Sequence, residues 1–162
     1  TESVVLPVEP AAAAVPYLTA EPDGSWSFSL AEDAVVYGLG EMPRGINKRG
    51  WHYVADNTDE SHHGENRLSY YGAHNFLLID GGAGRSVFGV FVDFPGKVFY
   101  DIGYTRHDRL TFRTEEPDYD LYILTGDSPN AVCTEFRKLI GHSYIPPKWA
   151  FGFAQSLSLI HI

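Results

Sequence analysis

The feature that most constrains the fold is a series of short apolar runs separated by residues that form turns. In the clearest run, Trp26, Phe28 and Leu30 alternate with three serines. This period of two predicts a strand with one buried face, and the Asp23-Gly24 pair before it predicts a turn. Similar runs, divided mainly by glycine, proline and aspartate, follow at Val35–Leu39, Asn75–Ile79, Ser86–Phe94, Lys97–Ile102, Arg109–Thr114 and Tyr119–Leu124. Several strands at this spacing predict a β-sandwich.

The stretch after the last of these runs predicts one amphipathic helix. Ser128 and Pro129 are favoured at an N-cap and a first helical turn, and Gly141 is suited to end the helix. The apolar positions at helical spacing are Val132, Phe136 and Ile140. We expect Cys133, in the same stretch, to be a small buried residue on the core side. The sequence therefore predicts a mainly β fold with one helix packed on the sheets.

The composition agrees with strands and turns and limits the partners. The 162 residues include 16 glycines, 10 prolines, 10 tyrosines and 10 phenylalanines, a content that favours β structure over helix. The formal charge is −9, from 12 Lys and Arg against 21 Asp and Glu, so we expect no nucleic-acid partner and no anionic membrane surface. No apolar run approaches the roughly 20 residues that span a bilayer. A neutral partner is favoured.

The single cysteine limits the covalent and metal chemistry. Cys133 alone can form neither an internal disulfide nor a four-thiolate zinc site. No Gly-x-Ser-x-Gly motif supports a serine nucleophile, and no pattern requires a cofactor. The lack of paired cysteines and of a secretory signal leans toward a cytoplasmic location without fixing it.

The segment from Gly40 to Tyr70 is longer than an ordinary connection and has no convincing period, so we expect a functional loop. It holds the densest set of hydrogen-bonding and aromatic side chains in the chain: Asn47, Lys48, Arg49, Trp51, His52, Tyr53, Asp56, Asn57, Thr58, Asp59, Glu60, His62, His63 and Glu65. That mixture suits the hydroxyls and the apolar ring faces of sugars. The loop is therefore the candidate binding region.

Two groups in this loop have a competing structural interpretation. Asp59 and Glu60 are adjacent carboxylates, but neighbours in an extended chain point to opposite sides, so we do not expect them to flank one glycosidic bond. His62, His63 and Glu65 lack the spacing of a metalloprotease motif. Hydrogen bonds within the loop are favoured over a metal site.

Two further motifs could bind phosphate, but a structural role is favoured for each. Lys48-Arg49 can hold a phosphate, but salt bridges within the loop are favoured in an acidic chain. The Gly-Gly-Ala-Gly run at residues 81–84 lies between two strand patterns and predicts a hairpin turn.

Four ordered blocks together resemble glycoside hydrolase family 31. They are Val36-Tyr37-Gly38-Leu39-Gly40-Glu41, Gly45-Ile46-Asn47-Lys48-Arg49-Gly50, Tyr71-Gly72-Ala73-His74-Asn75-Phe76 and Ile145-Pro146-Pro147-Lys148-Trp149-Ala150-Phe151-Gly152-Phe153. The resemblance covers roughly residues 33–156, and the second and third blocks are most similar to bacterial α-glucosidases. It implies an N-terminal β-sandwich, a galactose-mutarotase-like supersandwich, that precedes a (β/α)8 barrel.

The patterns and the resemblance divide the chain into four parts. Residues 1–24 are a leading linker segment, and residues 25–143 are the N-terminal β-sandwich. Residues 144–156 are a linker and the start of a truncated barrel, with its first strand within Trp149–Gln155. Where relatives continue Gln-Ser-Arg-Trp, this chain has Gln155-Ser156 and then residues 157–162, a hexapeptide that the transposase end of a common DNA-sequencing library encodes in frame. We expect that hexapeptide to be adapter read-through.

The resemblance also implies the chemistry and the site residue. The family is a retaining one, and its two catalytic aspartates lie on later barrel strands, so we expect this fragment to be inactive. Asp59, in Asn57-Thr58-Asp59-Glu60, falls where the N-terminal domain lends an aspartate to the active-site rim. We expect Asp59 to bind substrate hydroxyls, and Lys148 and Trp149 to anchor the sandwich to the missing barrel. The expected partners are an oligosaccharide and that barrel.

These expectations lead to one function with two alternatives. The favoured function is the N-terminal domain of an α-glucosidase that hydrolyses terminal α-linked glucose from short oligosaccharides. Another activity of the family, such as α-xylosidase or transglucosylase, is the first alternative. A stand-alone carbohydrate-binding or structural β-sandwich is the second, and it would predict a chain that ends near Ser143 without the Pro-Pro-Lys-Trp connector.

Overall fold

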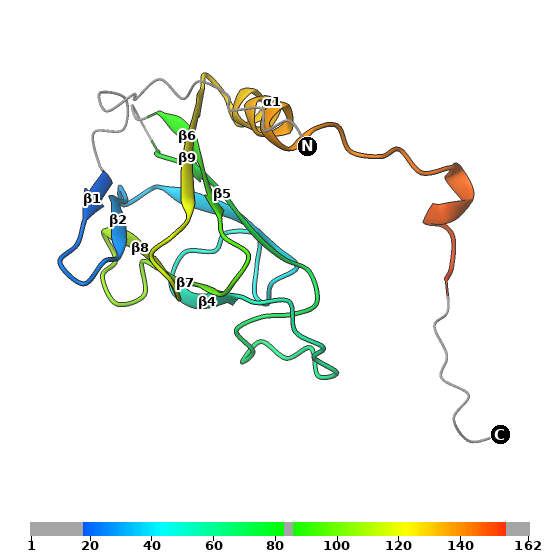
Figure 1. Cartoon of the computed structure of the whole chain (residues 1–162), viewed down its shortest axis with the longest axis horizontal. Helices are drawn as coiled ribbons and strands as arrows, with labels where there is room; N and C mark the ends of the chain where they lie inside the picture. The colour runs from blue at the N-terminus through cyan, green and yellow to red at the C-terminus, as the bar shows by residue number, and fades with distance from the viewer. Residues whose placement is uncertain (1–17, 83–85, 155–162) are drawn as a thin grey trace.

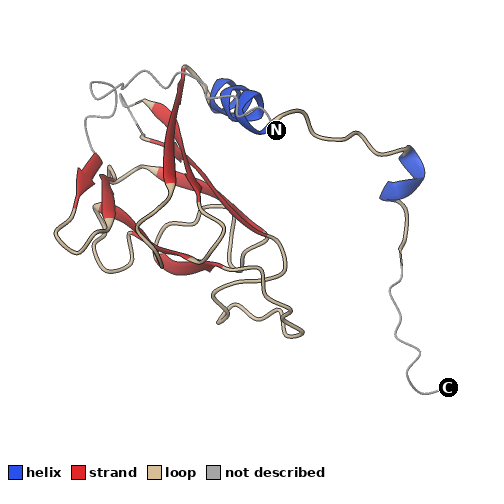
Figure 2. Cartoon of the chain, in the orientation of Figure 1, coloured by secondary structure: helices blue, strands red, loops and turns tan. Residues whose placement is uncertain are grey.

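Two antiparallel sheets make up the computed structural model, which describes residues 18–82 and 86–154 (Figure 1). One sheet has the strand order β1-β2-β8-β7-β4 and the other has the order β3-β5-β6-β9. The strands are β1 Leu18–Ala20, β2 Trp26–Ser29, β3 Val35–Gly40, β4 Trp51–Ala55, β5 Ala73–Asp80, β6 Val87–Asp93, β7 Val98–Ile102, β8 Arg109–Thr114 and β9 Asp120–Gly126. Strands dominate the described ranges (Figure 2), so the predicted mainly β fold is confirmed.

The core lies between the two sheets and is built from the inward-facing side chains of both. It includes Phe28, Tyr100 and Phe112 from the five-stranded sheet and Leu77, Phe88 and Val90 from the four-stranded sheet. The rings of Phe28 and Phe88 meet across the sandwich with their centroids 5.8 Å apart. Because alternate side chains of a strand share one face, each sheet buries one face here and leaves the other for loops or the helix.

Helix α1 (Pro129–Ile140) packs on the outer face of the four-stranded sheet, where it contacts β9, β6 and β5. Its N-terminus is capped as predicted, because the Ala131 N–H donates to Ser128 Oγ over 3.2 Å. Phe136 stacks on Phe76 of β5 with a centroid distance of 4.1 Å. The stack attaches the helix to the sheet through aromatic contact.

The buried stripe of this helix is narrower than predicted. Val132 and Phe136 are buried as expected, but Cys133 is exposed, which corrects the expectation of a core cysteine. One residue along a helix corresponds to about 100° of rotation, so Cys133 lies beside the stripe that Val132 begins. Ile140, in the last turn, is also exposed.

Two strands lie where the sequence predicts a loop or a linker. Strand β4 lies within the Gly40–Tyr70 segment and pairs with β7, and β1 lies in the leading segment and pairs with β2. Both are edge strands of the five-stranded sheet. An edge strand pairs on one side only, and β4 finds its partner more than forty residues away, so the local pattern carried little signal.

The predicted barrel strand at Trp149–Gln155 is wrong over its described part. The chain instead forms a 3-10 helix, Lys148–Phe151, in which the Ala150 N–H donates to the Pro147 carbonyl over 2.9 Å. A strand needs a neighbouring strand for its backbone bonds, whereas a 3-10 turn satisfies them locally. The aromatic residues of this segment are exposed, with Phe153 at 92%.

Some predictions concern residues beyond those that the structure describes. They are most of the leading segment, the centre of the glycine-rich turn at 81–84, and the hexapeptide at 157–162. The hairpin itself is confirmed, because β5 and β6 pair antiparallel on either side of that turn. Over the described ranges, no helix has the length and apolar character required to cross a bilayer.

Candidate functional site

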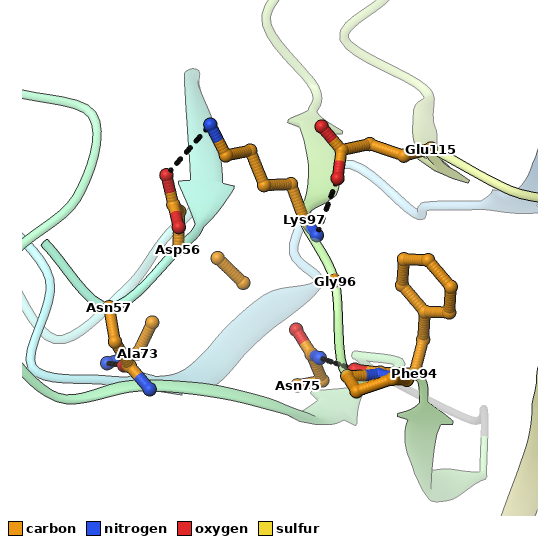
Figure 3. Close-up of a pocket in the computed structure, with 10 residues that line it drawn as sticks. Asp56, Asn57, Ala73, Asn75, Phe94, Gly96, Lys97 and Glu115 are labelled. Atoms are coloured by element: carbon orange, nitrogen blue, oxygen red, sulfur yellow. Dashed lines mark hydrogen bonds and ion pairs between the residues drawn. The ribbon is translucent and has the colours of Figure 1, made fainter.

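A pocket lined largely by polar side chains lies at one end of the sandwich, where the chain crosses between the two sheets. Three crossings meet there: β4 to β5, β6 to β7, and β8 to β9. The pocket has a volume of about 520 Å³. Its lining residues are Ala55, Asp56, Asn57, Ala73, Asn75, Phe94, Pro95, Gly96, Lys97 and Glu115. Figure 3 shows that strand ends and turns, rather than strand centres, supply these side chains.

Lys97 and two carboxylates, which contact opposite ends of this residue, form one wall of the pocket (Figure 3). Lys97 Nζ lies 3.1 Å from Asp56 Oδ2, and the backbone N–H of Lys97 donates to Glu115 Oε2 over 3.2 Å. The neighbouring Asp56 carboxylate raises the pKa of the Lys97 ammonium above its ordinary value, so this ammonium stays charged at neutral pH. The wall therefore offers both hydrogen-bond donors and acceptors to a ligand.

Two asparagines hold the opposite side in place. Asn57 Oδ1 accepts a bond of 2.7 Å from the Ala73 N–H, which ties the end of β4 to the start of β5. Asn75 Nδ2 donates to the Phe94 carbonyl over 3.2 Å, and this bond joins β5 to the β6–β7 turn. The pocket is thus a pre-formed polar hollow with one aromatic ring, Phe94, in its lining.

The loop between β4 and β5, residues 56–72, carries Asp59 away from the pocket. The Thr58 N–H donates to the Tyr70 carbonyl over 3.0 Å, so the two arms of the loop are joined near its base. The Ser69 hydroxyl also donates to the Asp56 carbonyl. Asp59 itself is exposed and does not line the pocket, although it lies only two residues beyond Asn57.

The adjacent carboxylates Asp59 and Glu60 have different surroundings. Glu60 Oε2 pairs with Arg67 Nε at 3.1 Å, and Glu60 Oε1 accepts a bond of 2.8 Å from the His62 N–H. Asp59 instead lies beside the Tyr71 hydroxyl, and a hydrogen bond to this carboxylate raises the pKa of that hydroxyl. Glu60 thus holds the loop together, whereas Asp59 stands at its surface.

The histidines of the loop make local contacts. His62 Nδ1 lies 2.9 Å from Ser61 Oγ. The His63 ring packs against Tyr70 and Tyr71 with centroid distances of 4.9 and 5.5 Å. Within 18–82 and 86–154, no cluster of three or more His, Cys, Asp or Glu side chains is arranged to hold a metal ion.

The Lys48-Arg49 pair is split by the fold, and its contacts differ from the expected salt bridges. Arg49 donates to backbone carbonyls, including those of Ala31 at 2.6 Å and His107 at 2.7 Å. Lys48 is buried and donates to the Pro43 carbonyl over 3.4 Å. Arg49 therefore ties together loops that lie far apart in the sequence.

The pocket contains two residues of the predicted binding loop, Asp56 and Asn57, and three polar residues that were not predicted: Asn75, Lys97 and Glu115. These three come from separate strand ends, and only the fold brings them to one place. The available signal was that each is a polar residue at or near the end of a predicted strand.

Comparisons with known proteins agree with this architecture. The model of the glycosyl hydrolase 31 N-terminal galactose mutarotase-like domain matches residues 16–101. The chain is 33% identical over 132 residues to alpha-glucosidase 2 of Bacillus thermoamyloliquefaciens and 30% identical over 124 residues to alpha-xylosidase XylQ of Lactiplantibacillus pentosus. These matches cover 80% and 76% of this chain but only 16% and 15% of those relatives.

Solved structures share the same fold. The dextranase of Flavobacterium johnsoniae, complexed with glucose, superposes with a TM-score of 0.69 at 25% identity and covers 85% of this chain and 16% of that one. The cycloalternan-degrading enzyme of Trueperella pyogenes has a TM-score of 0.68 at 22% identity and covers 79% of this chain and 18% of that one. Because the family model spans more than half of the chain, the protein belongs to glycoside hydrolase family 31 and corresponds to its N-terminal galactose-mutarotase-like domain.

Proposed function

We propose that this chain is the N-terminal domain of a retaining α-glucosidase and that its 56–72 loop forms part of the active-site rim. The parent enzyme would hydrolyse terminal α-linked glucose from short oligosaccharides. In this family the catalytic aspartates belong to a (β/α)8 barrel, so the domain contributes binding rather than bond cleavage. The similarity to an alpha-glucosidase supports this choice of activity.

The exposure of Asp59 on a braced loop is the observation that carries the proposal. Its neighbour Glu60 is neutralised by Arg67, whereas Asp59 lies beside the uncharged Tyr71 hydroxyl. A carboxylate in this position can accept bonds from sugar hydroxyls once a substrate approaches. The bonds at the base of the loop limit the conformational entropy that the loop loses on binding.

The test uses the full-length protein that carries this domain, with Asp59→Asn as the variant. A lost charged hydrogen bond costs about 1.5 to 3 kcal/mol, so we expect KM for maltose to rise about tenfold or more. Glu135→Gln on helix α1 is the control, because it removes one negative charge far from the loop. The control should leave KM unchanged.

Two outcomes would count against the proposal. Equal KM values for the wild type and Asp59→Asn would remove Asp59 from the rim. Hydrolysis of p-nitrophenyl α-xyloside in preference to maltose and p-nitrophenyl α-glucoside would assign the parent as an α-xylosidase. That activity is the second candidate because XylQ is an alpha-xylosidase of similar sequence.

A further inference from the structure

A second, smaller pocket lies where β3 leads into the following loop, and it is distinct from the pocket of Figure 3. Its volume is about 260 Å³. The lining residues are Gly38, Gly40, Arg44, Gly45, Ile46 and Lys48. Three glycines leave room beside the backbone, and the two charged residues of the lining are both cations.

Lys48 is buried in this wall without a matched counter-charge. Its side chain is 6% exposed, and its Nζ has one long bond, 3.4 Å, to the Pro43 carbonyl. The ammonium also lies 5.6 Å from the centre of the Tyr53 ring. Lysines are almost never so buried unless they are paired, and among the described residues the ion pairs do not include Lys48. Burial lowers the pKa of Lys48, the Glu65 carboxylate opposes that shift, and the positive charge of Arg44 adds to it.

Arg44 brings the second positive charge to the same wall. Its guanidinium lies 4.3 Å from the centre of the Trp51 ring and 5.3 Å from that of Tyr53, and Nη1 donates to the His52 carbonyl over 3.2 Å. Its Nε is buried and has no hydrogen-bond partner among the described residues. The backbone of Arg44 has φ +71°, a left-handed conformation that a non-glycine residue rarely adopts.

A buried tyrosine lies next to both cations, although it does not line the pocket. The Tyr53 side chain is 1% exposed; burial raises the pKa of its hydroxyl, and the neighbouring Arg44 guanidinium opposes that shift by its charge and by a hydrogen bond. Tyr53 and Arg44 therefore act on each other, which leaves the Lys48 ammonium as the group of this cluster with the weakest hydrogen bonding. The wall of the pocket therefore holds two cationic side chains, and within the part of the chain that the structure describes Lys48 has only one long hydrogen bond.

We propose that the pocket of Arg44 and Lys48 binds a small oxyanion of the phosphate class. Two neighbouring cations repel each other, and an anion between them removes that repulsion and accepts their free donors. The net charge of the chain is −9, so this local concentration of positive charge is contrary to its overall balance. The inference does not depend on the proposed hydrolase activity.

Glu65 is the internal competitor for this position. Its carboxylate acts electrostatically on both Lys48 and Tyr53, but the side chain is exposed and forms no ion pair with Lys48 within the described ranges. A free phosphate and the Glu65 carboxylate would both offer anionic oxygens to Lys48. We favour the free anion, because Glu65 and Lys48 do not form an ion pair within the described ranges.

The experiment titrates inorganic phosphate into the 162-residue chain at constant ionic strength and follows binding by calorimetry and by the unfolding temperature. We expect saturable binding to a single site. Lys48→Met and Arg44→Met should each weaken it about tenfold or more, because each removes a charged donor. Lys138→Met, at an exposed lysine on α1, is the matched control and should bind as the wild type does.

Two further variants distinguish phosphate from the Glu65 carboxylate and keep the test valid if a methionine variant does not fold. Lys48→Arg keeps the cation and should keep the binding even if Lys48→Met fails to fold. Glu65→Gln should strengthen phosphate binding severalfold, because it removes the competing carboxylate.

Two results would overturn the inference. Binding that persists equally in Lys48→Met and Arg44→Met would be that of an adventitious ion only. A lack of saturable binding in both the wild type and Glu65→Gln would mean that the pocket serves the internal carboxylate alone.

Discussion

Gly38 allows the backbones of β3 and β5 to approach closely. It has φ +120°, and a Cβ at this position would lie 2.2 Å from the Phe76 carbonyl oxygen. The pairing of the two strands shifts register between Gly38 and Gly40, as at a β-bulge. A side chain here would therefore have to separate two paired strands, and both the close approach and the backbone conformation require glycine.

Replacing Gly38 by alanine should destabilise the domain strongly. We expect Gly38→Ala to lower the free energy of unfolding by about 3 kcal/mol, from backbone strain and steric overlap together. Gly50→Ala is the matched control, because Gly50 has φ +89° but a methyl group added there would meet no atom within 4 Å. That control should lose only about 1 kcal/mol. Urea unfolding of both variants measures the difference, and equal losses would show that the overlap is relieved.

Neighbouring residues of similar chemistry take different roles in this protein. The alternation of an extended chain was enough to predict that Asp59 and Glu60 do not act as one pair, and their separate contacts agree. Lys48 and Arg49 also separate, but what each one contacts was not predictable. Lys48 contacts a carbonyl of its own loop and Arg49 contacts carbonyls of distant segments, and because every residue has a backbone carbonyl, the sequence does not indicate which one will be the partner.

At the scale of elements, predictability depends on how local the stabilising contacts are. Helix α1 has its cap and its buried stripe in one stretch of sequence, so its extent was predicted well. Strand β4 depends on β7, and its first two residues, Trp51 and His52, are both exposed although they point to opposite faces, so no clear alternation appeared. At Lys148–Phe151 the opposite happened, because a strand was predicted where the structure has none. The residues of this segment have a strand-like pattern, but no strand lies beside it within the described ranges.

The cap of α1 provides a prediction at this scale. Ser128→Ala removes the bond to the Ala131 N–H and should lower the free energy of unfolding by about 1 kcal/mol. Ser128→Asp should restore the cap, and its charge should interact favourably with the N-terminal end of the helix, whose first turn has no acidic residue. Thermal unfolding of both variants checks this. A loss in Ser128→Asp as large as that in Ser128→Ala would exclude the cap as the cause.

At the scale of the whole molecule, the sandwich and the C-terminal segment differ in how much apolar surface they expose. The core side chains of the sandwich are buried, whereas Trp149 and Phe151 are 81% and 75% exposed. In Figure 1 this orange segment extends away from the two sheets. Contiguous exposed apolar surface of this kind marks an interaction site or a tendency to associate.

This exposure predicts that the chain binds the dye ANS. Replacing Trp149, Phe151 and Phe153 together by serine should remove most of the fluorescence enhancement and leave the unfolding temperature unchanged, because these side chains do not contribute to the core. Tyr104→Ser is the control, since Tyr104 is an exposed aromatic residue on the sandwich itself. The control should bind the dye as the wild type does. Dye binding that the triple serine variant retains would place the apolar surface elsewhere.

The pocket of Figure 3 is bordered by three chain crossings that are not part of either sheet. Insertions or deletions in these crossings would change the width and polarity of the hollow, while the register of every strand and the core between them stayed the same. The same scaffold can therefore diversify at this end during evolution without renewed selection for folding. Related domains should vary most in length at residues 56–72, 94–97 and 115–119.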